Sequence, residues 1–471
     1  MKNDRDPGLE LEVLFRTQQA AFGREPYSDW ATRAGHLRAL DAMLRENRAA
    51  IVQAIHADFG NRAASETDIA DMLGCHLGIQ HALRHGRRWM TPERRSAGLM
   101  LMPARAQVIP QPIGVAGIIV PWNYPLFLAV GPLTGALAAG NRVMIKLSEL
   151  TPQFGDLFAR LIARTFAADH VTVINGEADI ARAFSSLPFD HLLFTGSTSV
   201  GRQVMHAAAE NLTPVTLELG GKSPALIGPG ARFEQAVDAI VSGKLFNAGQ
   251  TCVAPDYVMV PRGQAPAFLE RAKAITAKLY PDFERNCDYT SIISARHFER
   301  LQRLASEAVA RGATAHSLSA GDSDATARRF APLVITGAPD DTPLMQDELF
   351  GPLLPLIEYD HLDDALAYIN ARPRALALYL FETDRRAIDA TLARTHSGGV
   401  TINDTLLHVA CEALPFGGVG PSGMGAYHGI DGFRTFSHMK PVLTQSRFTL
   451  RPMVYPPYGK RVGAIVKFFL K

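Results

Sequence analysis

The sequence lacks several features that mark special classes of protein. It has few cysteines for 471 residues and no excess of one charge, with 48 Lys and Arg against 46 Asp and Glu. The cysteines are too far apart for a disulfide framework or a paired-cysteine metal site, and scattered basic residues argue against nucleic-acid binding. The polar first residues lack the apolar core of a signal peptide. We expect a cytoplasmic protein that binds no metal and no nucleic acid. The cysteines are Cys75, Cys252, Cys287 and Cys411.

Two segments resemble membrane-binding sequences. Residues 124–140 carry no charge, but they include Pro125 and Pro132 and fall short of the roughly 20 apolar residues that cross a bilayer. We expect a buried helix there. Residues 461–471 mix basic and apolar side chains, as membrane-surface helices do. We expect this part of the tail to pack on the protein or fray, with membrane-surface attachment as the alternative.

The first 90 or so residues show helical periodicity. Apolar residues between positions 37 and 55 recur at helical spacing, and Gly60 is a typical helix end. The run Ser65-Glu-Thr-Asp68 has the pattern of a capping box that opens a second helix.

The next part of the chain alternates between strand and helix. Short apolar runs are separated by stretches able to form helices, such as 154–166 and 199–211, and this predicts an α/β fold with a doubly wound parallel sheet. From Gly220 a second set begins, which predicts two domains sharing a cleft at the carboxyl ends of the strands. The expected strands are 113–120, 142–146, 170–174, 191–194 and 215–217, and the later helices 233–244, 265–279, 297–311 and 362–369.

Two apparent nucleotide fingerprints fail on inspection. Residues 220–223 end like a P-loop, but Thr216 stands where that motif needs glycine. Residues 418–423 fit G-x-G-x-x-G, but Pro421 lies inside and no strand–helix–strand unit follows, so we expect a tight loop. The segment 194–201 instead has the form of a strand ending at a helix N-terminus, where backbone N–H groups can bind phosphate.

Three polar residues could form a nucleophilic centre. Cys252 follows a polar turn that can lower the pKa of a thiol, Glu218 follows a strand as a base would, and Asn123 could donate to an oxyanion. Taken singly, each also fits a structural role, as a small core residue, a surface carboxylate and a turn residue.

Six ordered motifs carry a family resemblance over essentially the whole chain. They are Pro121-Trp-Asn-Tyr-Pro125, Phe194-Thr-Gly-Ser-Thr198, Leu217-Glu-Leu-Gly-Gly-Lys222, Asn247-Ala-Gly-Gln-Thr-Cys252, Glu348-Leu-Phe-Gly-Pro352 and Leu414-Pro-Phe-Gly-Gly418. Together they resemble the aldehyde dehydrogenase superfamily. Finer features, including Cys252-Val-Ala-Pro-Asp-Tyr257 and Gly425-Ala-Tyr-His-Gly429, are similar to the class 3 branch and particularly to its coniferyl aldehyde dehydrogenases.

The resemblance implies oxidation of an aldehyde to a carboxylic acid with NAD, and possible use of NADP as well. It implies that Cys252 forms a thiohemiacetal and then a thioester, that Asn123 holds the oxyanion, and that Glu218 is the general base. A carboxylate at Glu149 would favour NAD by repelling a 2′-phosphate. The implied cofactor-binding residues are Pro121, Trp122, Lys146, Ser148, Glu149, Gly196, Ser197, Val200, Leu219, Gly220, Glu348 and Phe350. Aromatic candidates for the substrate funnel are Trp122, Tyr124, Phe127, Phe433 and Phe436.

The same resemblance implies a domain plan and an assembly. We expect a Rossmann-type cofactor domain (1–97 and 111–219), a catalytic domain (220–415), bridging strands (98–110 and 430–450) and a tail (451–471). The bridging strands would pair across a homodimer. Three alternatives stay open: a medium- or long-chain aliphatic aldehyde as substrate, a non-oxidising thioesterase or acylating enzyme, and a scaffold protein without activity.

Overall fold

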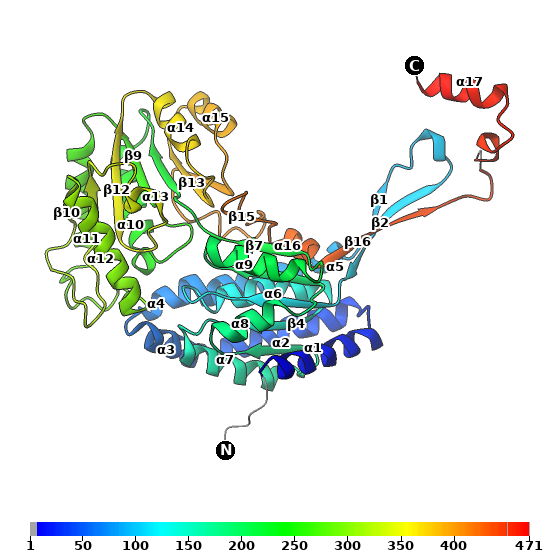
Figure 1. The fold of residues 1–471 in the computed structure, drawn as a ribbon, viewed down its shortest axis with the longest axis horizontal. Helices are drawn as coiled ribbons and strands as arrows, with labels where there is room; N and C mark the ends of the chain where they lie inside the picture. Colours follow the sequence, from blue (N-terminus) through cyan, green and yellow to red (C-terminus); the bar gives the residue numbers. More distant parts are fainter. Residues whose placement is uncertain (1–6, 450, 471) are drawn as a thin grey trace.

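The computed structural model describes residues 7–449 and 451–470 as two lobes, a projecting arm and a tail (Figure 1). The first lobe is built on a six-stranded sheet in the order β15-β7-β6-β3-β4-β5. All its pairs are parallel except β15 with β7. Its strands are β3 (Val115–Ile119), β4 (Arg142–Lys146), β5 (Val171–Ile174), β6 (His191–Thr195), β7 (Val215–Glu218) and β15 (Gly423–Met424).

Both faces of this sheet are covered, as its apolar strands predict. Along β4, Val143 and Ile145 point into one core cluster and Met144 into the other, because successive strand residues face opposite sides. The helices of this lobe are α1 (Pro7–Arg24), α2 (Trp30–Glu46), α3 (Arg48–Phe59), α4 (Ala64–Thr67), α5 (Gly74–Trp89), α6 (Phe127–Ala139), α7 (Pro152–Thr165), α8 (Ala178–Ser185), α9 (Thr198–Ala209) and α16 (Gly429–Thr435).

The second lobe holds a seven-stranded sheet in the order β10-β11-β12-β9-β8-β13-β14, whose pairs are parallel except β10 with β11. Its strands are β8 (Pro224–Ile227), β9 (Tyr257–Pro261), β10 (Thr314–Ser317), β11 (Leu333–Thr336), β12 (Leu353–Tyr359), β13 (Ala377–Phe381) and β14 (Gly399–Ile402). Its helices are α10 (Phe233–Leu245), α11 (Ala265–Leu279), α12 (Ala295–Ala310), α13 (Pro343–Gln346), α14 (Leu362–Asn370) and α15 (Arg385–Arg394).

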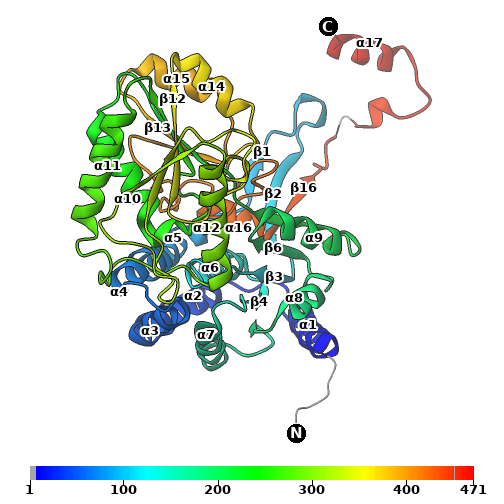
Figure 2. The same ribbon diagram turned by 60° about the vertical axis from the view of Figure 1, so that its left-hand side comes forward.

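The arm is a separate antiparallel sheet of three strands that extends away from both lobes (Figures 1 and 2). It pairs β1 (Glu93–Arg95) and β16 (Ser437–Thr444) with the two edges of β2 (Arg105–Pro112). Beyond it, α17 (Lys460–Phe469) lies away from the lobes in both views. The tail therefore forms a helix that does not pack on the body, contrary to the prediction.

Several local predictions are confirmed. Helix α3 ends at Gly60, whose φ is +81°, and α6 is a buried helix that covers most of the uncharged segment. Residues 418–423 form a tight loop in which Gly423 N–H donates to the Gly420 carbonyl at 3.1 Å. No helix in the described ranges is long and apolar enough to cross a membrane.

The predicted capping box is wrong. Helix α4 already begins at Ala64 with no side-chain cap, so Ser65 lies inside the helix rather than at its start. Asp68 begins a π-helical turn (Asp68–Leu73) and forms an ion pair with Arg48. The carboxylate therefore connects two helices instead of capping one.

Candidate active site

The turn before Cys252 has an unusual backbone that Gln250 holds in place. Asn247, Ala248 and Gly249 all have positive φ, of 51°, 50° and 74°. The Gln250 side chain donates to the carbonyls of Asn247 (3.0 Å) and Ser291 (3.1 Å) and accepts from the backbone N–H of Ile293 (2.9 Å). These buried hydrogen bonds fix the strained turn, so the position of Cys252 is well defined.

Two neighbouring residues from the first lobe are fixed to this turn. Asn123 Nδ2 donates to the Gln250 carbonyl at 3.1 Å, and the Tyr124 hydroxyl lies 2.7 Å from Thr251 Oγ1. The chain therefore brings the Asn123 amide beside the residues that lead into Cys252, although the two lie far apart in the sequence.

A buried cluster of charged residues holds the backbone of Asn123 in place. Arg62 donates to the Asn123 carbonyl at 2.9 Å and pairs with Asp71 at 2.9 Å, with Glu66 4.0 Å away. Burial raises the pKa of both carboxyl groups. The sequence did not reveal this cluster, because its members belong to no motif and a charged residue in a helical segment is usually solvated.

Glu218 lies at the end of β7, as predicted, but it is far more buried than a surface carboxylate. Its exposed fraction is 1%, and neither carboxylate oxygen has a hydrogen-bond partner in the described part of the chain. Burial raises its pKa well above the ordinary value, because desolvation disfavours the charged form. Such a group holds a proton more readily than an exposed carboxylate does.

The expected low pKa of the Cys252 thiol is wrong. Burial, with the nearby carboxylates of Glu348 and Glu218, raises its pKa to about 12. The polar turn does not offset the two negative charges, which come from distant parts of the sequence. The resting group is therefore a thiol, and its proton must leave during attack on a substrate.

A cleft of about 480 Å³ opens between the lobes at Cys252, a typical size for a small-molecule site. Nine of its lining residues were predicted from the sequence: Pro121, Trp122, Asn123, Gly196, Ser197, Leu219, Cys252, Glu348 and Phe350. Thr195 also lines it and has a buried hydroxyl with no partner among the described residues.

The other predicted cofactor residues do not line this cleft. Lys146 is buried and donates to the carbonyls of Leu147 (2.6 Å) and Gly176 (2.7 Å), and burial lowers its pKa. The Ser148 hydroxyl accepts from the backbone N–H of Leu150, while Glu149 and Val200 are exposed. Gly220 faces the Glu348 carboxylate, which occupies the space that a side chain at this position would need.

The cleft fits a dinucleotide cofactor. Helix α9 begins at its rim, where Ser197 caps the helix by accepting from the Val200 N–H at 3.4 Å, and a helix N-terminus favours a phosphate. Glu348 is positioned by Arg300, which donates to the carbonyls of Glu348 (2.6 Å) and Leu349 (2.7 Å). The unpartnered Thr195 hydroxyl supplies a further polar group for a ligand.

The predicted substrate-funnel residues fall into two groups. Trp122 lines the cleft, Tyr124 stacks on Phe246 at 6.4 Å, and Phe127 is half-buried over Gly74. Phe433 packs on Trp89, and Phe436 is fully buried against His191. The last two belong to the core between α16 and its neighbours, so the structure corrects their placement at an entrance.

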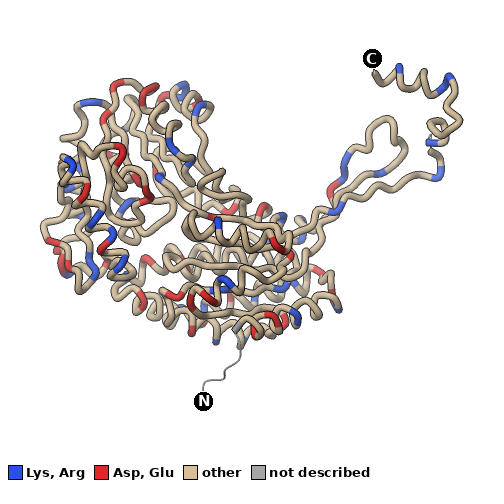
Figure 3. The backbone as a smooth tube through the Cα atoms, in the orientation of Figure 1, with Lys and Arg blue, Asp and Glu red and all other residues tan. Residues whose placement is uncertain are grey.

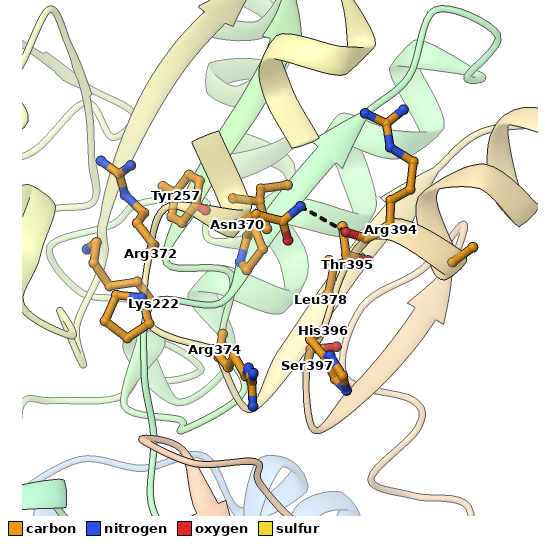
Figure 4. Close-up of a pocket in the computed structure, with 15 residues that line it drawn as sticks. Lys222, Tyr257, Asn370, Arg372, Arg374, Leu378, Arg394, Thr395, His396 and Ser397 are labelled. Carbon is orange, nitrogen blue, oxygen red and sulfur yellow. Dashed lines mark hydrogen bonds between the residues drawn. The ribbon is translucent and has the colours of Figure 1, made fainter. Parts of the chain in front are cut away.

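A separate basic pocket of about 250 Å³ lies in the second lobe (Figure 4). Most of its cations are already paired, Lys222 with Asp256 (2.7 Å), Arg372 with Asp340 (2.7 Å) and Arg394 with Asp363 (2.5 Å). Figure 3 shows segments of both charge signs interspersed along the chain in the two lobes. Within the described ranges no group of three or more His, Cys, Asp or Glu could hold a metal ion.

Comparison with known proteins identifies the family. The model of the aldehyde dehydrogenase family matches residues 10–442. The chain belongs to the aldehyde dehydrogenase family. It is therefore an NAD(P)-dependent oxidoreductase that acts on an aldehyde, which confirms the resemblance and the expected fold.

Several aldehyde dehydrogenases are similar over nearly the whole chain. The probable coniferyl aldehyde dehydrogenase of Pseudomonas aeruginosa is 52% identical, covering 98% of this chain and 97% of that protein. Coniferyl aldehyde dehydrogenase of a Pseudomonas species is 46% identical (91% and 90%), and aldehyde dehydrogenase family 3 member A2 of Macaca fascicularis is 39% identical (93% and 89%).

Two solved structures share the fold. A substrate-bound Staphylococcus aureus AldH has a TM-score of 0.92 at 36% identity, covering 98% of this chain and 99% of that one. A Mycobacterium tuberculosis aldehyde dehydrogenase complexed with NAD+ has a TM-score of 0.85 at 27% identity, covering 94% and 92%.

Proposed function

We propose that this aldehyde dehydrogenase oxidises coniferyl aldehyde or another aromatic aldehyde, with NAD preferred over NADP. The observation that carries the chemistry is that Asn123 and Cys252 line one cleft, with the buried Glu218 close enough to Cys252 to raise the pKa of its thiol. The similarity to coniferyl aldehyde dehydrogenases supports the substrate class.

Cys252 begins the reaction as the nucleophile. Its sulfur forms a bond to the aldehyde carbon, the carbonyl electrons move to oxygen, and the thiol proton passes to Glu218 or to water. The Asn123 amide donates to the resulting oxyanion of the thiohemiacetal. An aldehyde releases hydride readily only after this tetrahedral centre has formed.

The remaining steps divide between the cofactor and Glu218. Ser197, Glu348, Phe350 and Trp122 would hold the cofactor, whose nicotinamide supplies hydride-accepting chemistry when bound. Loss of hydride leaves a thioester on Cys252. Glu218 then takes a proton from the attacking water, the C–S bond breaks, and the acid leaves with regeneration of the thiol.

The preference for NAD depends on Glu149. Its exposed carboxylate follows β4 and Lys146, where it can accept from ribose hydroxyls and would repel a 2′-phosphate. A comparable kcat/KM with NADP would contradict this part of the proposal.

Three alternatives keep the same site but change the substrate or the chemistry. The similarity to aldehyde dehydrogenase family 3 member A2 favours an aliphatic, medium- or long-chain aldehyde as the competing substrate class. A non-oxidising thioesterase is disfavoured because the cleft beside Cys252 has the features of a cofactor site. An acylating enzyme is disfavoured because the base Glu218 is needed to activate water.

Reduced-cofactor formation tests the proposal directly. Purified protein is assayed with NAD and NADP against acetaldehyde, octanal, benzaldehyde and coniferyl aldehyde, with Cys252→Ser as control. Highest kcat/KM on coniferyl aldehyde, abolished in the variant, supports the proposal. Highest kcat/KM on octanal supports the aliphatic alternative, and no reduced cofactor with any substrate refutes aldehyde oxidation.

We also propose a cytoplasmic homodimer. The three-stranded arm projects from the lobes (Figure 1), and among the described residues the outer edges of β16 and β1 are unpaired, so strands of another subunit could pair with them. Light scattering should give twice the chain mass of 51.2 kDa; a tetramer or a monomer would contradict this assembly. Failure of the tail to bind anionic vesicles would dismiss its attachment to membranes.

A further inference from the structure

A second cavity is lined in part by Phe127 at the start of α6, four positions after Asn123, and shares no lining residue with the cofactor cleft. Six of its lining residues are glycines, and aromatic rings cover much of the rest. The aldehyde must reach Cys252 by a route that the cofactor does not fill, so this cavity is a candidate for the distal part of the substrate. It is lined by Gly74, Cys75, Gly78, Ala82, Trp89, Phe127, Gly131, Pro132, Thr134, Gly135, Glu412, Tyr427, His428, Gly429 and Gly432.

Tyr427 connects this cavity to the catalytic centre. Its phenol is buried without a hydrogen-bond partner in the described chain. Burial raises its pKa well above the ordinary value, and the charges of Glu218, Cys252 and Glu412 add to the effect. The phenol therefore lies within electrostatic reach of both Cys252 and Glu412.

The cavity offers polar groups whose hydrogen-bonding capacity the described protein leaves partly or wholly unused. His428 is 5% exposed, and neither ring nitrogen has a partner. Burial lowers its pKa to about 3, so the ring is neutral and presents one donor and one acceptor. Glu412 is half-buried, and its carboxyl accepts from the backbone N–H of Gly429, which leaves acceptor positions free.

Aromatic rings flank these polar groups. His428 stacks on Phe416 at 5.4 Å and meets Phe127 edge-on at 6.0 Å. Across the cavity, the glycines of α5 and α6 present bare backbone. A flat ring with a hydroxyl group would match this combination, whereas an alkyl chain would leave the buried polar groups unsatisfied.

We propose that Glu412 is a specificity-determining residue that accepts a hydrogen bond from the para-hydroxyl group of a 4-hydroxyaryl aldehyde, while His428 donates to a neighbouring ether oxygen. This inference rests on the proposed function. It deepens that function, because it assigns recognition of the far end of the substrate to named side chains.

Side-chain movement is part of the proposal. The free space is about 20 Å³, which holds about one water molecule. Phe127 is half-buried, so it can turn outward to admit the ring while Glu412 stays at the cavity, and rotamer changes of this kind are common on binding.

Three cinnamyl aldehydes that differ in their ring substituents test the inference. Coniferyl aldehyde has the free para-hydroxyl, 3,4-dimethoxycinnamaldehyde has it methylated, and cinnamaldehyde has neither substituent. With the unmodified protein we expect kcat/KM to be about tenfold or more higher for coniferyl aldehyde than for the methylated compound, because the carboxylate would lose its donor.

Variants of Glu412 separate a loss of substrate recognition from a general loss of activity. Glu412→Leu should raise KM for coniferyl aldehyde about tenfold with little change in kcat, and leave cinnamaldehyde within about twofold. Glu412→Gln keeps an acceptor oxygen without the charge and should fall between. Glu270→Gln, on the exposed face of α11, is the matched control. If the leucine variant fails to fold, the glutamine variant supplies the comparison.

The outcomes distinguish this inference from the proposed function. Equal losses on coniferyl aldehyde and cinnamaldehyde, or no preference for the free hydroxyl in the unmodified protein, overturn the role of Glu412 while aromatic aldehyde oxidation stands. No turnover of any cinnamyl aldehyde, with turnover of octanal, overturns both the proposed function and this inference.

Discussion

Asn123 is tied to the residue two positions before Cys252, through a hydrogen bond of 3.1 Å from its Nδ2 to the Gln250 carbonyl. Its own carbonyl accepts from Arg62, so the backbone and the side chain are fixed by different partners. The amide is therefore held in place before any substrate arrives, which is the condition for efficient oxyanion stabilisation.

Asn123→Ala should remove the oxyanion donor without removing the backbone contact to Arg62. We expect kcat/KM to fall about 10²- to 10³-fold, with a small change in melting temperature. Steady-state kinetics and thermal unfolding check this. A fall in activity below tenfold would mean that the Asn123 amide does not bind the oxyanion.

The thiol of Cys252 should titrate at unusually high pH in the free enzyme. Because burial and two carboxylates raise its pKa to about 12, the thiolate fraction should keep rising as pH increases from 7 to 10. Iodoacetamide labelling, followed at each cysteine by mass spectrometry, should show this rise at Cys252. The exposed Cys287 and Cys411 serve as internal controls; a plateau for Cys252 below pH 9 would contradict the expectation.

Glu348→Gln should make Cys252 more reactive toward iodoacetamide in the absence of cofactor. The substitution removes one of the two carboxylates that disfavour the thiolate, so the apparent pKa of the thiol should fall. The same labelling assay measures it. An unchanged pH profile would show that Glu348 does not contribute to the high pKa, which would then come from burial and Glu218.

The sequence predicted the architecture because its signals are local. Alternating apolar strands and helices, the stop at Gly60 and the uncharged α6 each follow from a few neighbouring residues. The residues of the cleft were found through family motifs, and the structure brings Asn123 and Glu348 to Cys252 as those motifs imply.

What the sequence missed depends on distant charges and on packing. The pKa of Cys252 is set partly by Glu218 and Glu348, which no local reading of the turn could include. Likewise, Phe436 looked like an entrance aromatic from its motif, but its ring is buried against His191. Spacing along the chain does not reveal which face of a helix end reaches the core.

Glu218→Gln should block hydrolysis of the thioester while allowing its formation. We expect a burst of about one equivalent of reduced cofactor and then a kcat lowered about 10²- to 10⁴-fold. Rapid mixing with coniferyl aldehyde measures both phases. Loss of the burst together with the steady state would show that Glu218 is needed already for attack by Cys252.

The pH dependence of kcat should reflect the ionisation of Glu218. The base must be ionised, and burial raises the pKa of Glu218 well above the ordinary value, so kcat should still be rising with pH where an exposed carboxylate would already be fully ionised. Glu218→Gln should remove this rise of kcat with pH. A kcat that is flat above pH 5 in the unmodified enzyme would argue against Glu218 as the base.

Arg62→Met should destabilise the fold and also disturb the site. It removes the cation of a fully buried pair with Asp71 and leaves two buried carboxyl groups, Asp71 and Glu66, without a positive charge. Breaking such a pair typically costs about 3–5 kcal/mol. Denaturant unfolding measures the loss, and Arg62→Met combined with Asp71→Leu should recover part of it because the second change removes one unpaired group. Since Arg62 also holds the Asn123 carbonyl, the double variant should regain stability without regaining full kcat; recovery of both would show that Arg62 does not position the oxyanion donor.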